Sequence, residues 1–325
     1  MTAALQAIAP GPYVTIQDAG RRGWRRFGVA TAGAMDYPSL AAANLLVGNP
    51  PDTPALEFGQ TGGVWTVATE SCRIAITGGD FRASAGGTPL RPWRSHTLRR
   101  GQQLIIQNAP DATWGYLAVA GGFDLVPQLG SCATHLRSGL GGRRLAEGDV
   151  LPLRADRAAD GPERGITALL RGTGPFRAVP GPQDDFFTPQ TLAGFFAATW
   201  RVSHRGDRMG TWMEGPPLRH ANGYNVLSDG VVPGCIQVPG SGQPVVLLMD
   251  CQTIGGFPKL ATIVTADLPR FAQTPPGSLI AFTAIDIDAA QSLHRDYRAS
   301  LAGLARQVTE IAPPTARPFW LRASH

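Results

Sequence analysis

Four short polar segments, each containing or flanked by glycine, hold the side chains of this sequence that could do chemistry: residues 17–21, 130–135, 206–210 and 237–259. Carboxylates can orient a ligand or take a proton, arginine and lysine hold anions, and glutamine amides read amide edges. The candidate catalytic residues are Asp18, Asp207 and Asp250. The candidate residues for binding substrate or phosphate are Arg21, Arg208, Gln237, Gln243, Gln252, Thr253, Gly255, Gly256 and Lys259.

Each segment also has a purely structural interpretation. Asp18 and Arg21 could be a surface pair in a turn. Asp207 could hold the fork of Arg208 for a carboxylate or phosphate, or the two could form a plain ion pair. The fourth segment has the pattern of a hairpin with polar groups at both ends, and we favour a pocket there over a decorated surface. The side chains that this pocket would gather are Gln237, Gln243, Asp250, Gln252 and Lys259.

Cysteine and histidine lie close together in the second segment, at Cys132 and His135, and these residue types occur together in thiol nucleophiles. Closeness in sequence does not define a catalytic pair, and free cysteines are most often buried, so we expect Cys132 to be structural. The four cysteines have no C-x-x-C spacing, and no two of the six histidines stand at metal-ligand spacing. The sequence therefore predicts neither a disulfide framework nor a metal site.

Lys259 is the single lysine of the chain, and its setting excludes two functions. A P-loop needs Gly-Lys followed by Ser or Thr, whereas Lys259 lies between Pro258 and Leu260. Covalent attachment of biotin needs a lysine between methionines on a tight hairpin, so any biotin would arrive on another protein. The sequence also lacks H-E-x-x-H, G-x-S-x-G, and a G-x-G-x-x-G that follows a strand.

The composition is that of a folded protein large enough for two lobes. The 325 residues are 43% hydrophobic and 16% charged, and domains usually contain about 100–200 residues. The net charge of +5 favours anionic ligands, but no basic stripe alternates with aromatic residues, so nucleic-acid binding is not expected. Because the N-terminus lacks a signal-peptide pattern and no stretch could cross a bilayer, we expect a cytoplasmic protein without a membrane partner.

Short strands and a few helices must position the polar segments, because 40 glycines and 28 prolines punctuate the chain. Asp36 and Gly48 mark the ends of one helix, and Thr188 with Pro189 caps a second. A last, amphipathic helix has Leu293, Tyr297, Leu301 and Leu304 on one face. Strands are expected at 13–16, 64–67, 73–77, 104–107 and 116–120, and again at Val226, Ile236, 245–249 and 261–264.

The polar stretch 154–165 is the best candidate for a linker, although a long hairpin loop would have the same composition. We therefore place an N-terminal β lobe at residues 1–153, a linker at 154–165, a C-terminal β lobe at 166–310 and a tail at 311–325.

Nine motifs, in order along nearly the whole chain, resemble the KipA family, also known as the biotin-dependent carboxyltransferase or allophanate hydrolase subunit 2 family. The motifs are V-T-I-Q-D-A-G-R, G-A-M-D, N-L-L-V-G-N, A-L-E, L-A-V-A-G-G, G-S-C-A-T, D-R-M-G, Q-V-P-x-x-G-Q-P and Q-T-x-G-G-F-P-K. They are most similar to the members of this family that work in 5-oxoprolinase. Two positions depart from the family pattern, since His135 stands where relatives often carry Asp and Phe257 where Tyr is usual. These departures weaken an acid–base role at 135 and imply that a phenol at 257 is not essential.

The resemblance implies a mainly β fold of two cyclophilin-like β-barrel lobes with a few short helices and a C-terminal helix. It also implies a subunit, inactive alone, of an ATP-dependent hydrolase that converts 5-oxoproline to glutamate. The implied partners are a KipI-like B subunit and a LamB/YcsF-like A subunit, with ATP used in the complex and no covalent biotin on this chain. Two alternatives stay open: the carboxyltransferase component of a urea-carboxylase-like biotin-dependent enzyme, and a non-enzymatic regulator of a KipI-like kinase inhibitor.

Overall fold

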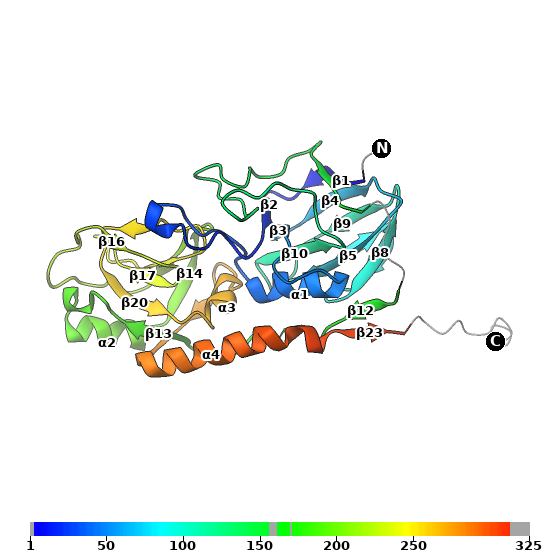
Figure 1. Ribbon diagram of the computed structural model, residues 1–325. Helices are drawn as coiled ribbons and strands as arrows, with labels where there is room; N and C mark the ends of the chain where they lie inside the picture. Colours follow the sequence, from blue (N-terminus) through cyan, green and yellow to red (C-terminus); the bar gives the residue numbers. More distant parts are fainter. Residues whose placement is uncertain (1–2, 156–160, 170, 313–325) are drawn as a thin grey trace.

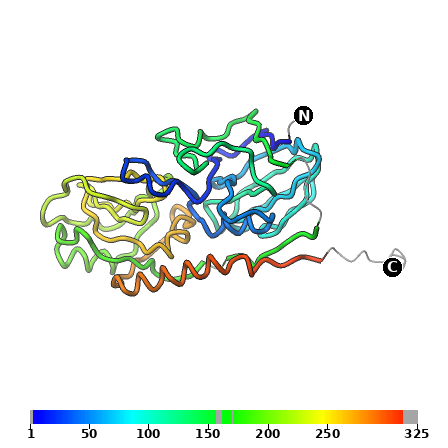
Figure 2. The backbone as a smooth tube through the Cα atoms, in the orientation of Figure 1, coloured from blue at the N-terminus to red at the C-terminus, as the bar shows by residue number. Residues whose placement is uncertain are grey.

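Two β-rich lobes lie side by side, and one long helix runs along both of them in the computed structural model of the protein (Figure 1). The structure describes residues 3–155, 161–169 and 171–312. The first strand of the described chain belongs to the N-terminal lobe and the last strand lies beside that lobe, so the chain crosses to the second lobe and returns (Figure 2).

Two antiparallel sheets form the N-terminal lobe. The first contains, in spatial order, β11 (Val150–Pro152), β1 (Ala4–Pro10), β4 (Gly63–Val67), β9 (Gln103–Ile106), β6 (Ala83–Ala85) and β7 (Thr88–Leu90). The second contains β2 (Val14–Gln17), β3 (Ala55–Gly59), β10 (Trp114–Val119), β5 (Ser71–Thr77) and β8 (Ser95–Arg99). An apolar core that includes Leu5, Leu104 and Ile74 fills the space between the sheets.

Helix α1 (Tyr37–Val47) covers the outer face of the second sheet, against β10 and β5. Both of these strands are buried along their whole length, because one face meets the core and the other meets α1. The Asp36 side chain accepts a hydrogen bond from the Ser39 N–H and begins the helix, while Gly48, at φ 85°, ends it in the left-handed region. The predicted helix boundaries are thereby confirmed.

An eight-stranded sheet that nearly closes into a barrel forms the C-terminal lobe. Its order is β21 (Leu279–Ile280), β14 (Trp200–Gly206), β15 (Gly210–Glu214), β18 (Val245–Leu247), β17 (Cys235–Gln237), β20 (Lys259–Ile263), β13 (Phe176–Pro180) and β22 (Phe282–Ala284). The two edge strands, β21 and β22, are separated by a single residue, Ala281. One bend therefore carries the chain from one edge of the sheet to the other, which leaves little free edge.

Smaller elements surround this barrel. Helix α2 (Pro189–Ala197), capped by Thr188 as predicted, packs against β22, and the short helix α3 (Leu268–Ala272) faces the N-terminal lobe. A two-stranded ribbon, β16 (Asp229–Gly230) with β19 (Ile254–Gly255), lies beside the strands β17 and β20 (Figure 1). The described residues also contain three short 3-10 helices, η1 (Arg25–Phe27), η2 (Asp184–Phe186) and η3 (Leu304–Gln307), and the last of these contacts α1 of the N-terminal lobe.

Helix α4 (Ile287–Gly303) is the predicted amphipathic C-terminal helix, and it spans both lobes (Figure 1). After it, β23 (Thr309–Ile311) pairs with β12 (Glu163–Gly165) beside the N-terminal lobe. The apolar face of α4 is only half buried, with Tyr297 and Leu301 over space between the lobes. The helix therefore bridges the two lobes and covers cavities between them, instead of packing tightly on either lobe.

The mainly β architecture with few helices is confirmed, but two strands differ from expectation. Val226 lies in an irregular segment instead of a strand, and β1 precedes the strand expected at the start of the chain. The division into lobes at residues 153, 166 and 310 stays a prediction. Residues 156–160 of the predicted linker and 313–325 of the predicted tail lie outside the described residues. No helix among the described residues is long and apolar enough to span a membrane.

Candidate functional site

Arg208 is the centre of a buried ion network between the two lobes. Its side chain, 1% exposed, forms ion pairs with Glu57 of β3 and with Asp250, which follows β18. Nε and Nη2 donate to the two oxygens of Asp250 at 3.0 and 2.8 Å, and Nη2 also donates to the Gly33 carbonyl at 2.6 Å. Since Nη1 is taken by Glu57, every arm of the guanidinium fork is engaged. Arg208 therefore joins the lobes and has no arm left for a ligand anion.

Glu57 was not among the predicted site residues. Its Oε2 accepts hydrogen bonds from the Met35 N–H at 2.8 Å and from the Tyr116 hydroxyl at 2.9 Å. Complete burial raises the pKa of Glu57, although Arg208 and these two donors oppose the effect. A glutamate inside the apolar strand A-L-E-F-G was the available signal, because a buried acid needs partners.

Asp207 does not hold the Arg208 fork, which was one of the predicted arrangements. Its Oδ1 accepts hydrogen bonds from the N–H groups of Met209, at 2.7 Å, and Gly210, at 3.3 Å. These bonds close the turn between β14 and β15. Asp207 is exposed at this turn, whereas its neighbour Arg208 points into the interior.

Asp18 and Arg21 are both buried, and together they hold the second polar segment in place. Asp18 accepts hydrogen bonds from the Ser131 hydroxyl at 2.6 Å and from the Cys132 N–H at 2.7 Å. Arg21 donates to the Ala133 carbonyl at 2.6 Å, while its Nη1 is buried without a hydrogen-bond partner among the described residues. The first two polar segments therefore form one unit.

Cys132 lacks the environment of a nucleophile. Burial, helped by the Asp18 charge, raises the pKa of its thiol and disfavours the reactive thiolate. His135 contacts other groups: its Nδ1 lies 2.7 Å from Ser138 Oγ and its Nε2 lies 3.3 Å from the Asp250 carbonyl.

Lys259, Asp229, Gln237 and Gln183 form a second polar centre, which we name the Lys259 cluster. Gln183 accepts a hydrogen bond from the Lys259 N–H at 3.0 Å and donates one to Asp229 Oδ2 at 3.1 Å. The Lys259 amine, on a side chain that is 5% exposed, donates to Asp229 Oδ2 at 2.5 Å and to the Gly230 carbonyl at 2.7 Å. Asp229 is 56% exposed, so it covers the amine from the solvent side. The hydrogen bond from Lys259 holds the pKa of the Asp229 carboxyl below its usual range.

Two glycines, Gly255 and Gly256, border this cluster. Gln237 pairs with Lys259 across β17 and β20. A Cβ added to Gly255 would lie 2.6 Å from the Gln237 Nε2, so glycine leaves room for that amide. Gly256 accepts a hydrogen bond from the Val226 N–H at 3.0 Å, which ties the exposed segment before β16 to the barrel.

The remaining residues of the fourth segment lie apart from this cluster. Gln243 exchanges hydrogen bonds with the Gly215 backbone, at 3.2 and 3.1 Å. Gln252 accepts a hydrogen bond from Arg25 through its backbone carbonyl at 2.9 Å, and Thr253 accepts one from a backbone N–H through its own. The predicted hairpin therefore brings Gln237 and Lys259 together but sends Gln243 elsewhere.

Arg25 is a further contact between the lobes that the sequence did not reveal. It belongs to η1 of the N-terminal lobe, and its guanidinium donates to the Val231 and Gln252 carbonyls of the C-terminal lobe. Figure 1 shows η1 reaching out toward β16. One side of the Lys259 cluster is thus built with help from the other lobe.

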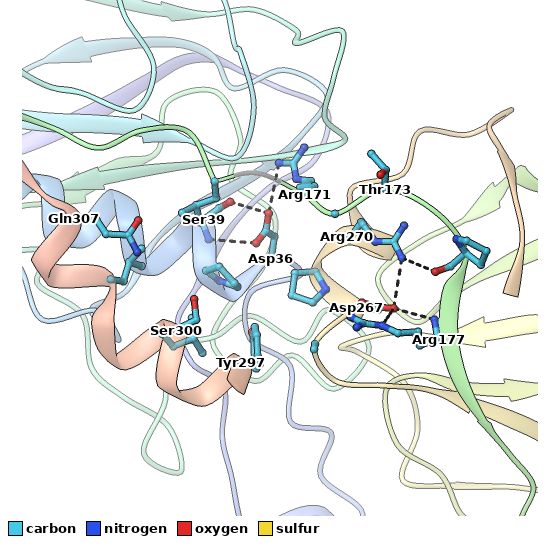
Figure 3. A pocket seen from close by; sticks show the side chains of 18 residues that line it. Asp36, Ser39, Arg171, Thr173, Arg177, Asp267, Arg270, Tyr297, Ser300 and Gln307 are labelled. Carbon is cyan, nitrogen blue, oxygen red and sulfur yellow. Dashed lines mark hydrogen bonds and ion pairs between the residues drawn. The ribbon is translucent and has the colours of Figure 1, made fainter. Parts of the chain in front are cut away.

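A cavity of about 540 Å³, which we name the larger cavity, lies between the lobes beneath α4. Figure 3 shows Arg171, Arg177 and Arg270 of this cavity paired with acids. Arg177 and Arg270 both contact Asp267, at 2.5 and 3.5 Å, and Arg171 lies 3.6 Å from Asp36. The charges of this cavity are therefore largely neutralised by its own residues.

A neighbouring cavity of about 380 Å³, the smaller cavity, shares Pro269, Tyr297 and Leu301 with the larger one. Two of the motifs singled out in the sequence line it, through Asp18 with Ala19 and through Ala34 with Met35. Its volume lies in the range of small-ligand sites. No group of three or more metal-binding side chains was found among the described residues.

A protein-family model described as "Carboxyltransferase domain, subdomain A and B" matches residues 27–284 of the chain. The C subunit of the 5-oxoprolinase of Escherichia coli is 38% identical over 93% of this chain and 97% of its own length. That of Haemophilus influenzae is 36% identical over 91% of this chain and 96% of its own length. The urea amidolyase of Saccharomyces cerevisiae is 30% identical over 93% of this chain, which spans 18% of that protein.

Solved structures with the same architecture are longer chains. TTHA0988 is 36% identical with a TM-score of 0.79 over 87% of this chain, which spans 55% of TTHA0988. The Kluyveromyces lactis urea amidolyase is 26% identical with a TM-score of 0.86 over 93% of this chain, which spans 20% of that one.

Proposed function

Because the chain belongs to the carboxyltransferase-domain family, we propose that it is one subunit of an ATP-dependent 5-oxoprolinase that hydrolyses 5-oxoproline to glutamate. The observation that carries this proposal is the 38% identity to the C subunit of a 5-oxoprolinase over 97% of that protein's length. The partners are a KipI-like B subunit and a LamB/YcsF-like A subunit. The isolated chain has no turnover, because the reaction needs all three proteins.

The barrier to this reaction is the resonance of the lactam amide. In the complex, ATP would transfer its terminal phosphoryl group to the lactam oxygen and leave as ADP. Water would then add to the activated ring carbon, and cleavage of the ring C–N bond with loss of phosphate would give glutamate. The remaining tasks are to hold the anionic substrate and to exclude bulk water, and both suit a cavity between two lobes.

Some of the candidate residues hold the two lobes or other residues in position, and others are placed to contact a ligand. Arg208 and Asp250 are engaged with each other and with Glu57, so they fix the relative place of the lobes. Asp18 is likewise held by the 131–132 backbone and side chain, at the wall of the smaller cavity. Lys259 is the predicted anion-binding residue whose partner, Asp229, is exposed enough to be exchanged for a ligand carboxylate or phosphate.

The test is co-expression of this chain with its candidate KipI-like and LamB/YcsF-like partners, followed by measurement of glutamate released from 5-oxoproline with ATP. We expect release from the three-chain complex and none when any one chain is omitted. A well-assembled complex that releases no glutamate would refute the proposal.

A carboxyltransferase role is the second candidate, favoured by the family description and by the TM-score of 0.86 to urea amidolyase. Carboxybiotin would then arrive on a partner protein, since Lys259 is the single lysine and is not in a carrier setting. Carboxylation of urea with a biotinylated carrier, assayed in parallel, separates the two reactions. Binding of a KipI-like protein without either turnover would instead indicate a regulator.

A further inference from the structure

We propose that Arg22 and Arg298 form the anion-binding part of a ligand site in the smaller cavity. The ligand is a small organic anion with a carboxylate or phosphate group and a compact body that contacts the apolar floor. Neither arginine was among the residues expected to bind substrate. The choice of probes below rests on the proposed function, whereas the site itself rests on geometry.

The cavity has an apolar floor and a basic rim. Ala34, Met35, Met249 and Leu268 contribute apolar surface from both lobes, and α4 closes the space with Leu301. At about 380 Å³ the cavity can hold a ligand of a few fused or substituted rings at most. Apolar surface with a small number of charged groups at one side is the usual composition of a small-ligand site.

Arg22 and Arg298 both line this cavity although they come from different elements. Arg22 follows β2 in the N-terminal lobe, and Arg298 lies on α4. Burial raises the pKa of the phenols of Tyr37 and Tyr297, and in both cases the charges of Arg22 and Arg298 oppose this effect. The two guanidinium groups therefore lie near the same two rings and converge on one space.

These two arginines differ from those of the larger cavity in having no partner within the described part of the chain. Neither guanidinium has a hydrogen bond or ion pair to any residue that the structure describes. Arg171, Arg177 and Arg270 of the larger cavity, by contrast, are each paired with an acid. An anion entering the smaller cavity would meet two cations that need not first release another partner.

Among the described residues, Asp18 is the acid that lines the smaller cavity, and it forms no ion pair with Arg22 or Arg298. Its oxygens accept hydrogen bonds from Gly20, Ser131 and Cys132. The motif V-T-I-Q-D-A-G-R ends in Arg21, which is 1% exposed and holds the Ala133 carbonyl. The next residue, Arg22, is exposed and lines the cavity. Arg22 therefore has the anion-binding role that the sequence had indicated for Arg21.

The experiment compares Arg22→Gln and Arg298→Gln with Arg295→Gln, a control on the same helix with the same loss of charge that lines neither cavity. Calorimetry on the purified chain measures the affinity for 5-oxoproline and for ATP, with 2-pyrrolidinone as the matched ligand that lacks the carboxylate. The same variants in the three-chain complex give KM and kcat for 5-oxoproline. Thermal unfolding of each variant checks that it is folded.

We expect both variants to weaken binding of one anionic probe by roughly 10-fold or more, since each removes a charge-assisted contact. Arg295→Gln should bind like the wild type, and 2-pyrrolidinone should not distinguish the variants. Loss confined to 5-oxoproline assigns the site to the substrate carboxylate, and loss confined to ATP assigns it to phosphate. Affinities that match the Arg295→Gln control, or no binding of either anion by the chain or the complex, would overturn the inference. Absence of glutamate release alone would refute the proposed function and not the anion site, which the calorimetry reports separately.

Discussion

Replacement of Arg208 by methionine tests the network that joins the lobes. The side chains of Arg208, Glu57 and Asp250 are 1%, 0% and 5% exposed, so Arg208→Met leaves two carboxylates buried without their cation. Removing one partner from a buried ion pair costs about 3–5 kcal/mol. Since 1 kcal/mol changes the unfolding midpoint of a domain of this size by about 2–4 °C, we expect a fall of roughly 6–20 °C.

The pH dependence of this loss has a definite sign. Burial already raises the pKa of Glu57, and Arg208 is the strongest influence opposing that effect. In the variant the pKa of the folded state rises further above its unfolded value. Because the folded state then holds its proton to higher pH than the unfolded state, the free energy of unfolding falls as the pH rises through the folded pKa. The difference between wild type and variant should therefore be larger at about pH 8 than at about pH 5.

Thermal unfolding followed by circular dichroism at these two pH values measures both effects. Arg295→Met, an exposed change on α4, is the control for loss of one positive charge. A variant whose midpoint stays within about 2 °C of the wild type, or whose deficit does not change with pH, would refute the view that Arg208 neutralises buried carboxylates.

Three further predictions concern other residues. Lys259→Met should lower glutamate release by the complex on the order of 10²-fold. The unfolding midpoint should change little, because the Asp229 left behind is 56% exposed. Activity equal to that of the wild type would exclude a contact between Lys259 and the reacting groups. Gly255→Ala should impair turnover while the chain stays folded, since the new Cβ would lie 2.6 Å from the Gln237 amide, and normal kinetics would show that this amide has no role. Burial alone would raise the pKa of Asp267, but the hydrogen bonds and charge of Arg177 hold it below its usual range, so its stabilising effect is present above the unfolded pKa and is lost as the pH falls. Asp267→Asn should therefore lower the free energy of unfolding by about 1–2 kcal/mol near neutral pH and weaken its fall toward acid pH. Urea titrations at several pH values measure this, and parallel pH profiles for the variant and the wild type would contradict it.

Local patterns were sufficient for much of the fold. Asp36 and Gly48 predicted the ends of α1, and Thr188 predicted the start of α2, because caps depend on hydrogen bonds within one turn of helix. The C-terminal helix followed from apolar residues at helical spacing. The ribbon β16–β19 was not predicted, and Val226 was wrongly assigned to a strand, because such short pairings depend on partners elsewhere in the chain.

The candidate site was predicted less completely. The polar segments were found, and the structure brings Gln237 beside Lys259 as the hairpin pattern suggested. Glu57 and Arg25 were missed, since each acts across the contact between the lobes and neither stands in a polar segment that attracted attention. Arg22 was passed over in favour of its neighbour, because sequence does not show on which side of a loop a side chain points.

By itself the sequence determined the secondary structure class, the helix caps, the exclusion of a P-loop and of a biotin-carrier lysine, and the family motifs. These features depend on residue types and on contacts between near neighbours in the chain. Only the tertiary structure decided that Arg21 is buried against backbone carbonyls and that Arg208 is buried in ion pairs. It also decided that Arg22 and Arg298 face a cavity without partners among the described residues. The physical reason is that burial and ion pairing depend on residues that are distant in the chain. The distances in space between such residues are fixed only when the two lobes come into contact.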